Sequence, residues 1–275
     1  MSHFTVAVFT SDENQSIDDL LAPYDENIEC APYVWRTREE LIQGQKSSLQ
    51  NTVKGLYAEW MKDPDAYEAQ CKSNPGHIAY LKSVPERLEW TDEQFYQEAI
   101  HGYEPEELTE DGGVLSTHNP KSKWDWYEVG GRWQGSLILK DGAEGYRGSP
   151  GLMTEMTENH DAAYMRDIDF EAMYRRNAAQ IAPYAEAIKN SFYTEEYMKA
   201  KYPTEEEYIR SRTEFYTHAV ITPDGVWHES GQMGWFGFSA ATPEDEREWR
   251  NRYYERFIKP ALEHNWYLTI VDCHI

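Results

Sequence analysis

Three residues at the two ends of the chain carry side chains that can move protons or bind a divalent metal. His3 opens an aromatic and β-branched segment, residues 4–10, and Asp272 and His274 follow a similar segment, residues 266–271. Imidazole and carboxylate groups act as general acids and bases and as ligands of transition metals. If the two segments pair as antiparallel strands, His3 meets Asp272 and His274. These three residues are therefore the candidate catalytic group.

The segment Lys123–Trp133 combines flat aromatic rings with a planar cation. Tryptophan and tyrosine rings can stack on a base, a nicotinamide or a cation, and Arg132 offers a two-pronged donor for phosphate or carboxylate. Gly130 and Gly131 can take positive φ or let another chain segment approach closely. A second aromatic and glycine-rich segment occupies residues 231–238. The two segments predict an aromatic pocket formed by Trp124, Asp125, Trp126, Tyr127, Arg132, Trp133, Trp235 and Phe236.

The same stretch also has a purely structural interpretation. It can be a hairpin whose aromatic side chains close the core and whose Arg132 is neutralised by Asp125. In an extended conformation, Trp124, Trp126 and Glu128 would share one face because strand residues alternate between faces.

Several familiar catalytic motifs are absent or incomplete. No phosphate-cradling glycine loop, no G-x-S-x-G and no H-x-x-x-H or H-E-x-x-H spacing occurs, so neither metal ligands nor a cofactor can be assigned. Residues 3–5, His-Phe-Thr, fit the H-x-T element of two-histidine phosphoesterases, but the second element would have to be residues 218–220, which lack the Thr or Ser. Cys273 beside His274 does not predict thiol chemistry, because adjacent strand residues point to opposite faces.

Composition limits the classes of partner. The 275 residues carry a formal charge of −23, with 49 acidic and 26 basic side chains. This charge argues against direct nucleic-acid binding and leaves open a basic host protein or a mimic of nucleic-acid charge. The three cysteines form no C-x-x-C and predict a reducing cytoplasm. We expect no signal peptide and no membrane span, because no sufficiently long apolar run occurs.

The order of strand-like and helix-like segments predicts a single α+β domain over residues 1–275. Its sheet is expected to be mainly antiparallel and to pair the N-terminal and C-terminal strands. Helical patterns, one of them opened by a T-x-x-E capping box at residues 37–40, fill two large insertions. The helical insertions are expected at about 37–110 and 155–212. Further strands are expected at 136–140, 215–222 and 226–229.

The chain resembles a family of uncharacterised proteins found in tailed bacteriophages and some bacteria. The segments that carry the resemblance are MSHFTV (1–6), LAPYDEN (21–27), KWDWYEVGGRW (123–133), THAV (217–220), MGWFG (233–237) and VDCHI (271–275). They reach both ends of the chain. The resemblance implies a phage or mobile-element setting and interference with a host process or defence, and it brings no activity or catalytic residues.

Three functional hypotheses follow. The first is a cytoplasmic binding or interaction protein that uses the aromatic pocket for a nucleotide-like ligand or a host partner. The second is a metal-assisted hydrolase of a phosphorylated small molecule that uses His3, Asp272 and His274. The third is an acidic mimic that blocks a nucleic-acid-binding host protein. The first is favoured because no complete catalytic motif occurs.

Overall fold

The computed structural model of the protein describes residues 2–152, 154–234 and 239–275. The chain divides into two compact units, one made of residues 1–28 and 118–275 and the other of residues 29–117. The first unit contains a mixed sheet together with both chain ends, and the second is mostly helical. Among the described residues, no helix combines the length and the apolar character needed to cross a bilayer.

The sheet of the first unit confirms the predicted α+β class. Within the described residues it has seven strands in the order β5-β4-β9-β1-β7-β8, and β6 also pairs with β9. The β1·β7 and β4·β5 pairs are parallel and the other pairs are antiparallel, so the sheet is mixed. The strands are β1 (His3–Thr10), β4 (Trp126–Gly131), β5 (Ser149–Pro150), β6 (Ala162–Tyr164), β7 (Ala219–Ile221), β8 (Trp227–Glu229) and β9 (Tyr267–His274).

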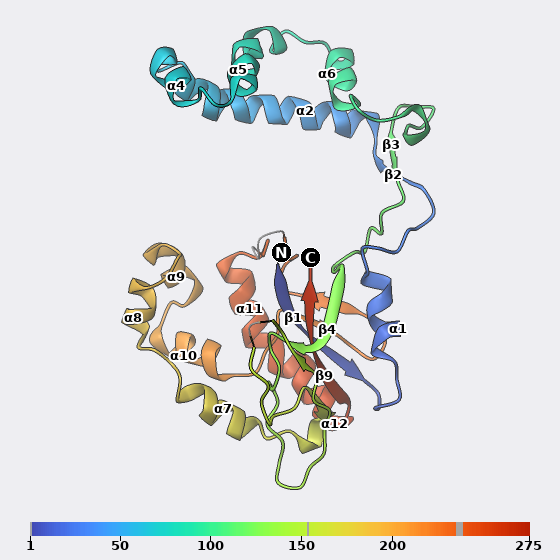
Figure 1. Ribbon diagram of the computed structural model, residues 1–275, viewed down its shortest axis with the longest axis vertical. Coiled ribbons are helices and arrows are strands. Elements are labelled where there is room, and N and C mark those ends of the chain that lie inside the picture. The colour runs from blue at the N-terminus through green and yellow to red at the C-terminus, as the bar shows by residue number, and fades with distance from the viewer. Residues whose placement is uncertain (1, 153, 235–238) are drawn as a thin grey trace. The chain divides into compact units, whose positions relative to one another are not determined.

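The central pair, β1 and β9, joins the two ends of the chain as predicted. The strands run antiparallel over their whole length, from His3 opposite His274 to Thr10 opposite Tyr267, and lie side by side in Figure 1. The middle of β1 is fully buried on both faces, which suits its run of β-branched and aromatic residues. The first and last residues of the described chain therefore meet at one end of the sheet.

Helices cover the two faces of this sheet. On one face, Ala7 and Phe9 pack in a cluster with Tyr253 of α11. On the other face, Val8 packs in a second cluster with Leu21 of α1. Alternate residues of one strand thus enter different hydrophobic clusters, as the two-residue period of a strand requires.

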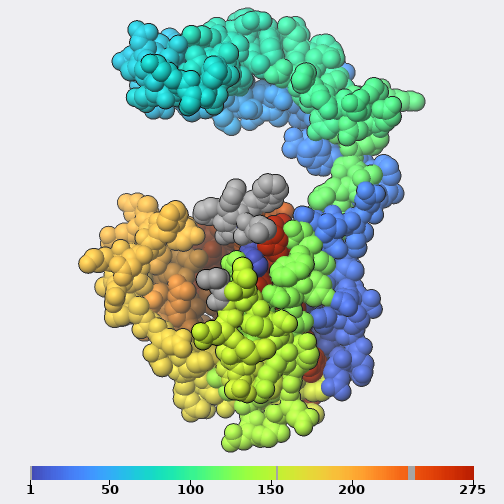
Figure 2. Space-filling model, viewed as in Figure 1, coloured from blue at the N-terminus to red at the C-terminus, as the bar shows by residue number. Residues whose placement is uncertain are grey.

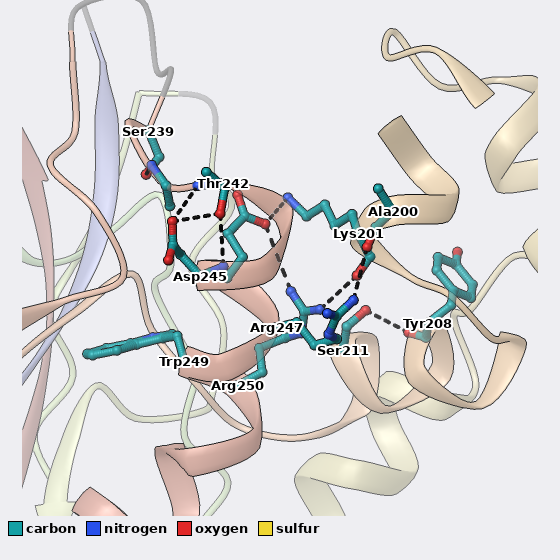
Figure 3. Close-up of polar contacts among 12 residues, drawn as sticks. Ala200, Lys201, Tyr208, Ser211, Ser239, Thr242, Asp245, Arg247, Trp249 and Arg250 are labelled. Carbon is teal, nitrogen blue, oxygen red and sulfur yellow. Dashed lines mark hydrogen bonds and ion pairs between the residues drawn. The ribbon is translucent and has the colours of Figure 1, made fainter. Parts of the chain in front are cut away.

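The helices of the first unit are short, and α1, α7, α9, α10 and α11 have side-chain N-caps. A capping box between Thr242 and Asp245 begins α11. The last carbonyls of α9, at Ala200 and Lys201, accept hydrogen bonds from Arg247 and Arg250 of α11 (Figure 3). The bounds are α1 (Ile17–Leu21), η1 (Ala22–Tyr24), η4 (Met165–Asp167), α7 (Phe170–Ala178), α8 (Tyr184–Lys189), α9 (Glu195–Lys201), α10 (Glu205–Thr213), α11 (Pro243–Tyr253), the π-helical turn η6 (Tyr254–Ile258) and α12 (Lys259–Glu263).

The second unit is built on a long helix whose capping box at Thr37 was predicted. Its own hydrophobic cluster includes Leu41, Leu49, Val84 and Phe95. The elements are β2 (Tyr33–Arg36), α2 (Arg38–Thr52), the π-helical turn η2 (Val53–Tyr57), α3 (Ala58–Trp60), α4 (Pro64–Gln70), α5 (Pro75–Arg87), α6 (Asp92–Ala99), η3 (Pro105–Glu107) and β3 (Val114–Ser116).

Two expectations for local structure are wrong. Residues 136–140 do not form a strand but make two isolated bridges, Leu137 with His160 and Leu139 with Ile168. Residues 162–164, expected to be helical, form β6 and pair with β9. At residues 162–164 the pairing with β9 overrides the local pattern, because sheet hydrogen bonds and burial outweigh intrinsic propensity. At residues 136–140 the hydrogen bonds go to two separate segments, around His160 and around Asp167, so no continuous ladder forms. The strand expected over 215–222 is also shorter, since β7 covers only Ala219–Ile221.

Gly148 is expected to tolerate no side chain. A Cβ added there would lie 2.0 Å from the carbonyl oxygen of Val129 in β4, so Gly148→Ala should lower the free energy of unfolding by about 1–3 kcal/mol through overpacking. The matched control is Gly44→Ala in α2, where an added Cβ meets nothing within 4 Å. This change should instead stabilise by about 0.5–1 kcal/mol, the usual helix gain. Urea unfolding of both variants measures the difference, and equal effects would contradict the packing.

Candidate functional site

The strand register gathers the chemically active side chains on one face at one end of the sheet. His3 lies opposite His274, and His274 lies opposite Trp126 of β4. Two residues along, Glu128 of β4 lies opposite Asp272. Since alternate strand residues share a face, all five side chains belong to the same patch. The predicted convergence of His3, Asp272 and His274 is confirmed.

Each histidine of this patch is hydrogen-bonded to a carboxylate of its own. The Nδ1 of His3 lies 2.9 Å from Oδ1 of Asp272, and the Nδ1 of His274 lies 2.6 Å from Oδ1 of Asp125. A carboxylate only accepts, so each Nδ1 is the donor. We call these four residues the carboxylate–histidine site.

The two imidazole rings lie close together. The ring centroids of His3 and His274 are 5.0 Å apart, and the planes are nearly perpendicular at 76°. Because each Nδ1 holds its proton toward a carboxylate, the Nε2 atoms are the positions that can exchange a proton with a ligand. The Nε2 of His274 is buried and has no hydrogen-bond partner among the described residues. Buried polar atoms are normally hydrogen-bonded, and this nitrogen is one of five buried side-chain atoms of the described residues that are not.

Trp126 forms an aromatic side of the site. Its ring centroid is 6.3 Å from that of His3 and 6.3 Å from that of His274, edge-on in both cases. The side chain is nevertheless 47% exposed. The two histidines thus contact a large ring that stays about half exposed to solvent.

Asp272 also holds the turn that ends β4. Its Oδ2 accepts a hydrogen bond of 2.9 Å from the backbone N–H of Arg132. This contact needs the glycine at position 131, which has a φ of +55° and where a Cβ would lie 2.4 Å from the Asp272 carboxylate. Both properties expected of the glycine pair, positive φ and close approach, are present here.

Glu128 is a third carboxylate beside the site. Burial, and next the facing charge of Asp272, raise the pKa of Glu128 above its usual range, while His3 opposes the shift. Two carboxylates directly opposite each other across a strand pair repel. Glu128 therefore binds a proton more readily than an exposed glutamate does.

The residues of the predicted aromatic pocket are distributed over both faces of the sheet. Trp124 and Tyr127 join the hydrophobic cluster under α1, where the Trp124 indole donates to the Leu21 carbonyl. Trp133 packs against the cluster on the opposite face. The expectation that Trp124 and Trp126 share a face is wrong, because regular strand geometry begins only at Trp126. Trp235 and Phe236 lie outside the described residues.

Arg132 is not neutralised by Asp125, contrary to the structural interpretation of the sequence. Asp125 instead contacts His274 through both its carboxylate and its backbone N–H. The Arg132 side chain is exposed, and no hydrogen bond or ion pair to its guanidinium occurs among the described residues. The backbone N–H of Arg132 is hydrogen-bonded to Asp272, so this cationic side chain is attached to the main chain next to the carboxylate–histidine site.

The second histidine of the site is His274, not His218 of the incomplete H-x-T pair. The ring of His218 lies 5.3 Å from that of Phe4, which belongs to the cluster under α1. Burial lowers the pKa of His218. For metal chemistry, the described part of the chain contains no group of three or more His, Cys, Asp or Glu side chains placed to hold one ion.

Asp161 is a structural residue that the sequence did not reveal. Fully buried, it accepts hydrogen bonds from the N–H groups of Gly135 at 2.6 Å and Gly148 at 2.9 Å. It thereby joins the loops after β4, whose atoms form the yellow-green surface in Figure 2. Burial raises the pKa of Asp161 despite these bonds. The glycines signal tight loops, but no local pattern indicates which carboxylate they share.

Removal of the Glu128 charge is expected to stabilise the protein at neutral pH. A carboxyl whose pKa is raised on folding contributes most favourably below its unfolded pKa, and this contribution is lost as pH rises through the raised value. Glu128→Gln should therefore increase the melting temperature by a few degrees near neutrality, and the gain should vanish toward about pH 4. Thermal melts across this range measure the effect.

The control for this change is Glu144→Gln, which removes a carboxylate that is exposed in a loop. It should leave the melting temperature close to that of the wild type at every pH. A stabilisation by Glu128→Gln that is independent of pH would contradict repulsion from Asp272.

Comparisons of the chain with protein-family models, with curated proteins and with solved structures found no match. Its function is therefore inferred from its own residues.

Proposed function

We propose that the carboxylate–histidine site cleaves a phosphate ester of a nucleotide-like small molecule by acid–base catalysis. The observation that carries the proposal is the duplicated arrangement of His3 on Asp272 at 2.9 Å and His274 on Asp125 at 2.6 Å, with the rings 5.0 Å apart. A carboxylate behind an imidazole fixes its orientation and stabilises its protonated form. With two such pairs side by side, one imidazole can act as the general base and the other as the general acid.

The pairing favours phosphoryl over acyl chemistry. In phosphoryl transfer the attacking and leaving oxygens lie on opposite sides of phosphorus, roughly in line. Two separate imidazoles can then serve the two oxygens. In acyl transfer a single histidine takes the proton from the nucleophile and returns it to the leaving group, so a second oriented histidine would have no role.

The proposed reaction is a hydrolysis in which water is the nucleophile. The Nε2 of one imidazole takes a proton from water, the water oxygen forms a bond to phosphorus, and the bond from phosphorus to the leaving oxygen breaks. The protonated Nε2 of the other imidazole gives its proton to that leaving oxygen. Proton exchange with solvent then restores the starting states. Both atoms belong to His3 and His274, and no step needs a metal.

Two neighbouring side chains support the nucleotide-like class of substrate. The half-exposed ring of Trp126 offers a stacking surface for a base next to the histidines. The exposed guanidinium of Arg132 offers a bidentate contact for non-bridging phosphate oxygens. Of the predicted aromatic pocket, the proposal therefore keeps Trp126 and Arg132 as ligand-binding residues.

His3→Asn is expected to abolish most of the turnover while the fold is kept. The Asn amide can still donate to Asp272 as Nδ1 does, but it has no group at the Nε2 position. Loss of one proton-transfer group should lower kcat by about 10²–10⁴-fold. The assay uses para-nitrophenyl phosphate, bis-para-nitrophenyl phosphate and a dinucleotide. His274→Asn should behave alike.

The matched control is His264→Asn, since His264 stacks on Trp266 and is exposed at the end of α12. It should retain full turnover. Turnover should persist in EDTA and should fall at both acidic and alkaline pH, because one imidazole must be neutral and the other protonated. Binding of these esters without hydrolysis would overturn catalysis and leave a binding protein, and inhibition by EDTA would favour the metal-assisted alternative.

Arg132→Lys is expected to weaken substrate binding without changing stability. Lysine keeps the charge but loses the two-pronged donor, so KM should rise by about tenfold. The melting temperature should stay unchanged because the side chain is exposed. Arg175→Lys, an exposed arginine of α7 paired with Glu171, should change neither property. An unchanged KM in Arg132→Lys would remove Arg132 from the site.

A further inference from the structure

A second candidate site lies in the same unit and shares no residue with the carboxylate–histidine site. It is a cavity of about 440 Å³ lined by residues of α7, α10, the segment after α10, α11 and η6. Its floor is the buried side chains of Met173, Tyr253 and Ile258. The volume is within the range of pockets that bind small molecules. We call this site the aromatic cavity.

The walls and the mouth of the aromatic cavity are mostly rings. Phe170 and Phe215 meet edge to face with their centroids 5.9 Å apart, and Phe215 meets Tyr253 at 6.2 Å. At the mouth, Tyr174 and Tyr254 are 46% and 55% exposed. Rings that remain exposed around a hollow leave apolar surface in water, which a ligand could cover.

A backbone irregularity shapes the cavity on the α11 side. The N–H of Lys259 bonds to the carbonyl of Tyr254, five residues earlier, as in a π-helical turn. The next residue, Pro260, has no N–H and its ring crowds the carbonyl four residues before it, which accounts for the widened turn. Tyr253 and Phe257 stay in the core while Tyr254 is exposed at the mouth. Such turns occur frequently at functional sites.

The polar rim is held in place without a ligand. Arg210 pairs with Glu214 at 2.9 Å and reaches Asn251 at 3.5 Å. Arg250 is fixed by the carbonyl of Lys201 at 3.0 Å, as Figure 3 shows. A rim that is already ordered reduces the entropy lost on binding. The amide nitrogen of Asn251 remains able to donate.

We propose that the aromatic cavity binds a neutral, planar aromatic molecule of one or two fused rings with a hydrogen-bonding edge. The rings of the walls and mouth select a flat aromatic partner through stacked and edge-to-face contacts. The rim carries Arg210 and Arg250 against Glu214 and Glu255, so the lining selects neither a cation nor an anion. The hydrogen-bonding edge of the ligand faces Asn251, whose amide can donate through its nitrogen and accept through the second lone pair of Oδ1. This site is independent of the proposed hydrolysis.

The test uses indole as the probe and cyclohexanol as a non-aromatic molecule of comparable size. Their affinities for the full chain are measured by saturation-transfer NMR titration. The double variant Tyr174→Ala, Tyr254→Ala removes two exposed rings and should keep the fold. Indole binding should weaken by about tenfold, as expected for the loss of aromatic contacts. Tyr146→Ala, which removes a 57% exposed tyrosine that does not line the cavity, should leave the affinity unchanged.

Three outcomes would overturn the proposal. They are no binding of indole to the wild type, equal binding to the wild type and the double variant, and binding of cyclohexanol as tight as that of indole. Phe215→Trp supplies a second check, because a larger ring in the wall should fill the space and also weaken indole binding. None of these variants touches His3 or His274, so ester hydrolysis should persist in all of them.

Discussion

The antiparallel pairing of β1 with β9 is the contact on which the candidate site depends. Within this pair, His3 stands opposite His274 because Ala7 and Phe9 must enter one hydrophobic cluster while Val8 enters the other. A slip of one residue would turn every side chain of β1 to the opposite face. Burial of the apolar residues in the middle of the strands therefore fixes the geometry of the polar residues at their ends.

Asp272 connects this pairing to the turn after β4. The side chain is 1% exposed, and a buried carboxylate is strongly unfavourable unless hydrogen bonds compensate for the lost hydration. The His3 imidazole and the N–H of Arg132 supply these bonds. The turn can come close enough only because position 131 is a glycine. The same contacts that satisfy the buried charge thus orient His3 and place Arg132 beside it.

The unit contains two candidate sites of different chemical character. The carboxylate–histidine site lies at the ends of strands, where charge-assisted hydrogen bonds orient the rings and the partner of the His274 Nε2 is still missing among the described residues. The aromatic cavity lies against helices, where ring contacts and a π-helical turn before Pro260 keep a hollow open. The oriented imidazoles of the carboxylate–histidine site are suited to proton transfer. The apolar lining of the aromatic cavity is suited to binding a small molecule.

The sequence by itself determined the α+β class, the pairing of the terminal strands, the capped helices and the meeting of His3, Asp272 and His274. Hydrophobic alternation and capping are local properties, and the termini offered one simple pairing. Only the tertiary structure decided that Asp125 orients His274, that Trp124 and Trp126 lie on different faces, that residues 162–164 form a strand and that Asp161 joins the loops. These features depend on contacts between segments that are 13 to 149 residues apart and on the turns that enter each strand. No local pattern encodes either of them.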